Sequence, residues 1–138
     1  DTARVTDNNS TDKATMLKPA DAEAAELRSW VGAGDAVDYY CFELANPVEL
    51  TLGLSAPEAA VKVKLLREEP DGSVSQVMSR SVKANRGLDH TLSLTSGTYF
   101  VEVASYDNGA GRYNTTYALE LEKEEENGET KRFTIANA

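Results

Sequence analysis

The sequence predicts an all-β domain, an antiparallel β-sandwich of the jelly-roll kind with about seven to nine strands. Three observations support this fold class. Apolar and polar residues alternate with a period of two from residue 27 onward. Turn-forming residues separate these stretches at short intervals, and no stretch shows a strong helical period. Strands of this kind place one face against a core and the other in water.

The first 24 residues are polar and rich in turn-forming residues. Asp, Asn, Ser and Thr in the stretch TDNNSTD compete for local backbone hydrogen bonds, which favours a loop. The next stretch, ATMLKPADAEAAEL, is ambiguous, because its alanines favour a helix whereas Pro19 interrupts one. The first clear strand is ELRSWV, which ends at Gly32.

The remaining strands follow from the alternation. In DYYCFEL, the side chains of Tyr40, Phe42 and Leu44 share one face. VELTLGL and VKVKLL repeat the pattern, with Val and Leu on one face and polar residues on the other. SVSQVMSRSV is weaker and more polar, so we expect it at an edge. LDHTLSL, TYFVEVAS and TYALELE complete the set, and KRFTI adds one more.

The composition changes near the end of the chain. Five glutamates fall between Glu122 and Glu129. We expect a solvated hairpin whose tip is the Asn127-Gly128 pair, because Asn-Gly is typical of tight hairpin turns. A linker into a following module is the alternative.

Length and charge exclude several classes of function. A chain of 138 residues suits one domain. The net charge of −9 argues against a nucleic-acid surface, which needs clustered Lys and Arg, and against binding to anionic lipid. No apolar run approaches the length of about 18 residues that spans a membrane, so we expect no membrane insertion.

Catalytic side chains are scarce. Cys41 is the only cysteine, and its place in an apolar alternation predicts a buried structural thiol. A nucleophile needs a base, and the only histidine, His90, lies in phase with three leucines, which favours packing. No GxSxG, HExxH or P-loop pattern occurs. We therefore predict that the chain is not an enzyme.

Two oxygen-rich stretches are candidates for holding a hard cation. Calcium takes about six to eight oxygen ligands from carboxylates, amides and backbone carbonyls. DNNSTD contains Asp7 and Asn9, and GDAVD contains Asp35 and Asp38. Neither stretch matches an EF-hand loop, and from the chemistry alone a solvated turn is the preferred interpretation.

Tyrosines supply a second surface signal. Tyr106 and Tyr113 flank the stretch DNGAGR, so we expect them to be exposed and to contribute to a surface for a protein or glycan. Tyr99 and Tyr117 are expected in the core. A carbohydrate-binding jelly-roll module is the alternative function, although the single Trp30 gives an aromatic platform little material.

Three stretches, in order, resemble the bacterial pre-peptidase C-terminal domain, a β-sandwich related to the collagen-binding domains of clostridial collagenases. The first is DNNSTDKATML. The second is WVGAGDAVDYYCFEL, which resembles the Gly-Asp-x-x-Asp-Tyr-Tyr-x-Phe signature of the family. The third is LSLTSGTYFVEVASYDNGAGRYNTTYALELE. Together they span about residues 7–122.

The resemblance implies a non-catalytic accessory module of a secreted or cell-surface bacterial protein, acting in substrate targeting, adhesion or spacing. It also implies a calcium ion between the N-terminal segment and the Asp-x-x-Asp turn, which would bring together Asp7, Asn9, Asp35 and Asp38. The N-terminal segment departs from the family pattern, which typically has Glu ahead of Asn where this chain has Asp7. The tyrosine surface of the collagenase domains has no counterpart that we can place, so collagen binding is not expected.

We therefore expect three segments. Residues 1–24 form a polar N-terminal segment that packs on the domain, residues 25–122 form the sandwich, and residues 123–138 form an acidic hairpin or linker. We also expect the chain to be part of a longer multidomain protein, with a protein or glycan as its partner.

Overall fold

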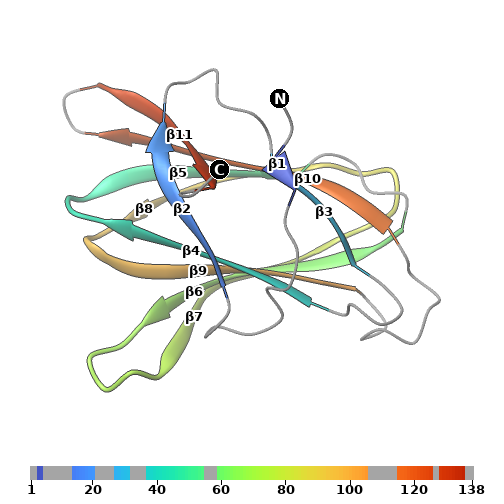
Figure 1. The fold of residues 1–138 in the computed structure, drawn as a ribbon, viewed down its shortest axis with the longest axis horizontal. Helices are drawn as coiled ribbons and strands as arrows, with labels where there is room; N and C mark the ends of the chain where they lie inside the picture. Colours follow the sequence, from blue (N-terminus) through green and yellow to red (C-terminus); the bar gives the residue numbers. More distant parts are fainter. Residues whose placement is uncertain are drawn as a thin grey trace.

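A computed structural model describes residues 3–4, 14–20, 27–31, 37–54, 59–105, 115–125 and 128–135. These residues contain eleven strands and no helix, so none of them belongs to a helix that could cross a membrane. The strands are β1 (Ala3–Arg4), β2 (Thr15–Ala20), β3 (Leu27–Val31), β4 (Val37–Leu44), β5 (Val48–Leu54), β6 (Val61–Glu68), β7 (Val74–Val82), β8 (Leu88–Leu94), β9 (Gly97–Ser105), β10 (Thr115–Glu125) and β11 (Thr130–Ile135) (Figure 1).

The strands form two sheets, called sheet A and sheet B here. In sheet A, β5 lies between β8 and β10, and the other edge of β10 pairs first with β3 and then with β11. Sheet B has the order β2-β4-β9-β6-β7, and its last four strands lie side by side in the lower part of Figure 1. All pairs are antiparallel except β1 with β3 and β2 with β4. The predicted antiparallel β-sandwich is confirmed.

The nine strands that the alternation predicted correspond to β3 through β11. The structure contains two further strands, the short β1 and the six-residue β2, which the alternation did not predict. β2 forms where the sequence was ambiguous between helix and loop. Its first two residues pair with β4 of sheet B, and its last four pair with β11 of sheet A. Pairing with both sheets stabilises the strand and overrides the local preference of alanine for a helix.

The core lies between the sheets. Tyr40, Phe42 and Leu44 face it, as the alternation predicted. The ring of Phe42 stacks on Tyr99 of β9 with centroids 5.6 Å apart, and it lies 5.0 Å from the ring of Phe133 of β11. These rings therefore join the middle of sheet B to sheet A.

A smaller apolar cluster covers the outer face of sheet B. Cys41 lies between two core-facing residues of β4, so its side chain points to the opposite face. There it contacts Leu66 and Phe100, with Ala14 and Tyr39 packed against them. Burial, followed by the charges of two nearby glutamates, raises the pKa of the thiol to about 11. The predicted burial of the Cys41 thiol is confirmed.

Two turns within the described residues contain a glycine with a positive φ. Gly72 adopts a φ of 86° in the turn between β6 and β7, where its N–H donates to Glu69 O at 2.9 Å. Gly128 adopts a φ of 85°, and its N–H donates to Glu125 O at 2.8 Å in the hairpin that joins β10 to β11. Such positive φ values favour glycine. Strand β10 runs from Thr115 to Glu125 and so continues past the predicted segment boundary at residue 122, which means that the acidic hairpin extends sheet A. The division of the chain into three segments stays a prediction.

Candidate functional site

Asp38 is the one predicted metal ligand that lies within the described residues. It is the second residue of β4 and shares the phase of Tyr40 and Phe42, so its side chain points between the sheets. Only 1% of its surface is exposed. The carboxylate is therefore part of the sandwich interior and not of a solvated turn.

Asp38 belongs to a hydrogen-bond network with two tyrosines. The hydroxyl of Tyr117, on β10, donates to Oδ2 of Asp38 at 2.5 Å. The hydroxyls of Tyr117 and Tyr40 lie 2.6 Å apart. Because the single hydroxyl proton of Tyr117 goes to Asp38, Tyr40 is the donor in this second bond. The network joins β4 of sheet B to β10 of sheet A.

The network also changes the chemistry of Tyr117. Burial raises the pKa of its hydroxyl well above 10, and the neighbouring Tyr40 and the Asp38 carboxylate raise the pKa further. Tyr117 therefore stays neutral and acts as a donor at physiological pH. Its role as a partner of Asp38 was missed by the sequence analysis, which assigned it only to the core.

The other predicted site residues lie outside the described part of the chain. They are Asp7, Asn9, Asp35, Tyr106 and Tyr113. Within the ranges that are described, no group of three or more His, Cys, Asp or Glu side chains is arranged to hold a metal ion. The calcium site and the tyrosine surface therefore stay predictions.

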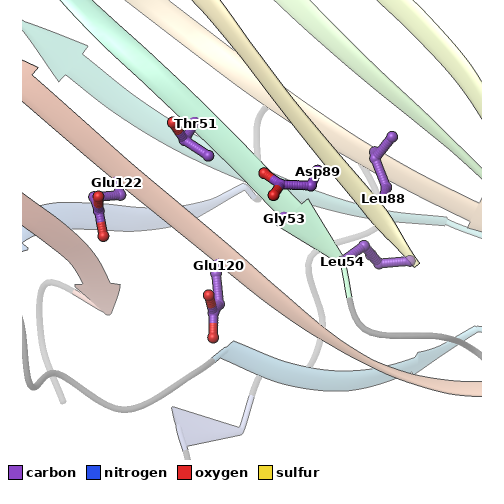
Figure 2. Close-up of a pocket in the computed structure, with 7 residues that line it drawn as sticks. All are labelled: Thr51, Gly53, Leu54, Leu88, Asp89, Glu120 and Glu122. Carbon is purple, nitrogen blue, oxygen red and sulfur yellow. The ribbon is translucent and has the colours of Figure 1, made fainter.

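A hollow on the outer face of sheet A is a second candidate site (Figure 2). Its volume is about 340 Å³. Gly53 of β5 lies opposite Asp89 of β8 on one side and opposite Glu120 of β10 on the other. Because glycine has no side chain, a gap opens between the two carboxylates. A Cβ atom at Gly53 would meet no atom nearer than 3.7 Å.

Oxygen atoms dominate the surroundings of this hollow. The hydroxyls of Thr51 and Thr91 lie 2.9 Å apart in the next row of the sheet. One row further, Ser93 donates to Glu49 Oε1 at 3.3 Å. Arg132 Nη2 lies 3.9 Å from Glu120 Oε2. The face presents hydrogen-bond acceptors and negative charge, and no aromatic ring is among the described residues that line the hollow.

His90 lies in β8, opposite Leu52 of β5. It is half-buried and shares the phase of Leu88, Leu92 and Leu94, as the sequence predicted. This position supports a packing role for the only histidine of the chain.

No protein-family model and no curated protein matches this sequence significantly. Solved structures do match its fold. The chain is similar to the pre-peptidase C-terminal domain of a collagenase from Bacillus anthracis, with 18% identity and a TM-score of 0.56 over 88% of this chain and 94% of that one. A more distant likeness is to the mitogen derived from Yersinia pseudotuberculosis, with 15% identity and a TM-score of 0.49 over 70% of this chain and 82% of that one. The chain therefore has the fold of a pre-peptidase C-terminal domain, which the three sequence stretches predicted.

Proposed function

We propose that the chain is a non-catalytic accessory module of a secreted or cell-surface bacterial protein, acting in substrate targeting, adhesion or spacing. The observation that carries this proposal is the fold, which the chain shares over most of its length with a domain of a bacterial collagenase. The packing position of His90 agrees with it, because nucleophilic catalysis needs a base that can reach a nucleophile.

Deletion in the full-length protein tests the module role. Removing residues 1–138 should reduce retention of the protein on its surface or macromolecular target. It should leave the turnover of a small soluble substrate by any other domain unchanged. A loss of that turnover equal to the loss of retention would assign the chain to the catalytic machinery and contradict the proposal.

We further propose that calcium stabilises the fold by joining the polar N-terminal segment to the start of β4. The proposed ligands are Asp7, Asn9, Asp35 and Asp38, whose carboxylates and amide are the hard oxygen donors that calcium prefers. An ion that binds only the folded chain raises stability by mass action, by about 2.7 kcal/mol at a hundredfold excess over its dissociation constant.

Thermal melting with excess calcium and with a chelator tests this second proposal. Calcium should raise the melting midpoint by several degrees, and Asp35→Asn should remove that rise. Asp38→Asn should remove the rise as well. Asparagine is preferred to alanine at this position, because its amide oxygen still accepts a bond from Tyr117 inside the sandwich. Asp89→Asn, on the outer face of sheet A, is the matched control and should keep the full rise. An unchanged midpoint in the parent chain would exclude a structural calcium ion.

A further inference from the structure

Strand β7 forms the outer edge of sheet B. Within the described residues it pairs only with β6, and it lies at the bottom of the sheet in Figure 1. Seven of its nine residues are exposed, and only Met78 and Val82 are buried. The exposed residues include two apolar side chains, Val74 and Val77, each 42% exposed. An exposed edge of this kind offers backbone N–H and C=O groups to another strand.

The protection of this edge is incomplete. Natural sheets shield exposed edges with proline, with several charges or with a β-bulge. β7 contains no proline and one charged residue, Arg80. It does contain a bulge at Val77, because Leu65 pairs with Met78 whereas Leu66 pairs with Gln76. The bulge divides the edge into two regular stretches, Val74–Gln76 and Met78–Val82, and the longer one, Met78–Val82, offers more positions for pairing with a new strand.

The charge around this stretch is opposite to that of the whole chain. Residues 61–87, which include β6, the turn and β7, contain six basic residues and three acidic ones, in a chain whose net charge is −9. The acidic residues, Glu68, Glu69 and Asp71, lie together at the turn. The basic residues are Lys62, Lys64, Arg67, Arg80, Lys83 and Arg86. In the register of the sheet, Lys62 lies opposite Ser81 and Lys64 lies opposite Ser79. Serine is small, so the side chain of Lys62 is within reach of a strand added about 4.8 Å beyond β7. The ammonium of Lys64 lies 4.0 Å from Glu102 of β9, on the other side of β6.

Charge also decides against a second copy of this chain as the occupant. An antiparallel pairing of Met78–Val82 with itself about a two-fold axis would be centred on Arg80. It would place each Arg80 directly opposite its copy, and like charges in directly opposed positions destabilise a sheet.

We propose that the Met78–Val82 edge of β7 binds an extended acidic peptide segment, which joins sheet B as one more strand. Backbone hydrogen bonds to β7 would supply part of the affinity. Arg80, which lies opposite Val63 and shares the phase of Met78 and Val82, would attract carboxylates on that face of the added strand. Lys62 would attract those on the outer face. This gives the proposed module a class of partner and rests on the proposed function only for its biological setting. Failure of the peptide test leaves the deletion and calcium tests unaffected.

Titration of the isotope-labelled chain with synthetic peptides tests the proposal by NMR. The probe is the capped peptide Thr-Glu-Val-Glu-Val-Glu-Thr, and the control probe carries lysine in place of each glutamate. The glutamate peptide should shift the amide signals of Met78–Val82 and bind at least about tenfold more tightly than the lysine peptide. Absence of binding, or shifts confined to other strands, would overturn the proposal.

Methylated probes separate strand addition from simple ionic attraction. In an added strand, alternate amides face β7 and the others face water. Of two glutamate peptides that are N-methylated at alternate residues, one should therefore lose binding and the other should retain it. Equal binding of both peptides would show an ionic patch only and overturn the proposal.

A charge-reversed variant and its matched control locate the site on the chain. Arg80→Glu should weaken binding of the glutamate peptide about tenfold. Lys18→Glu makes the same change of net charge at an exposed position of β2 and should change the affinity less than twofold. Equal effects of the two variants would indicate the overall charge and contradict a site at β7. A dimer that forms without peptide and is lost in Arg80→Glu would name a second copy as the occupant and overturn the proposal.

Discussion

Two tyrosines of this structure donate a hydrogen bond to a carboxylate, in contrasting surroundings. Tyr117 donates to Asp38 between the sheets at 2.5 Å, and Tyr39 donates to Glu102 on the outer face of sheet B at 2.7 Å. The two bonds are similar in length and in chemistry. They differ in what surrounds the acceptor, since Asp38 is 1% exposed whereas the side chain of Glu102 is 15% exposed and lies 4.0 Å from Lys64.

Two hydrogen bonds of similar length can therefore contribute differently to stability, because their acceptors differ in exposure to water. Water and Lys64 can solvate Glu102 when the tyrosine hydroxyl is absent. Water reaches Asp38 poorly, so removing a donor from its carboxylate imposes a desolvation penalty on the folded state. We therefore expect the inner pair to contribute more to the free energy of unfolding than the outer pair.

The largest expected effect follows from Tyr117→Phe, which removes the inner donor and keeps the ring. The free energy of unfolding should fall by about 2–3 kcal/mol, because the acceptor is a buried charge. Urea unfolding at neutral pH measures this loss. Tyr99→Phe is the matched control, since its hydroxyl donates to a neutral carbonyl, Thr95 O, at 2.9 Å, and it should lower the free energy by about 1 kcal/mol. Equal losses in the two variants would contradict the special role of Asp38.

Local patterns in the sequence predicted the strands of both pairs but not the pairs themselves. Alternation and turn residues act within a few positions, so the sequence was sufficient to predict β3 through β11. Asp38 and Tyr117 are separated by 79 positions, and their contact depends on which strand of sheet A lies across from β4. One local signal was available. Asp38 lies two residues before Tyr40, in phase with the core-facing side chains, which places a carboxylate where a buried donor is required.

Two other features were missing from the prediction for the same physical reason. β2 is a strand because both sheets supply an edge for it, which its own residues do not show. The hollow at Gly53 depends on the register that aligns Asp89 and Glu120 with it. A glycine inside an alternating stretch was the only local sign of such a gap.

A smaller effect is expected from Tyr39→Phe, which removes the donor of the outer pair. The free energy of unfolding should fall by about 0.5–1.5 kcal/mol, the range of an ordinary hydrogen bond, because solvent can replace the lost partner. The same urea measurement at neutral pH gives the value. A loss as large as that of Tyr117→Phe would show that burial does not distinguish the two pairs.

Alkaline pH sharpens the comparison for the outer pair. Burial, followed by the hydrogen bond to Glu102 and the charge of Glu102, raises the pKa of Tyr39 from 10.0 to about 12. The unfolded chain releases this proton near pH 10 and the folded chain only near pH 12. The contribution of the Tyr39 hydroxyl to the free energy of unfolding is therefore complete below pH 10 and is lost as the pH rises to about 12. Urea midpoints between pH 9 and pH 11.5 should fall less steeply in Tyr39→Phe than in the parent chain, and parallel profiles would exclude Tyr39 as a cause.

The smallest effect is expected from Lys64→Gln, which removes the cation beside Glu102. The ammonium and the carboxylate lie 4.0 Å apart and the Lys64 side chain is 36% exposed, so the free energy of unfolding should change by less than about 0.5 kcal/mol. A double-mutant cycle with Tyr39→Phe measures the coupling between Lys64 and the tyrosine bond. If solvent screens the outer pair, the coupling energy should also stay below about 0.5 kcal/mol. A coupling above about 1 kcal/mol would mean that Lys64, Glu102 and Tyr39 act as one network. The outer face of sheet B would then be stabilised by a coupled polar network, as the interior is by the network of Asp38.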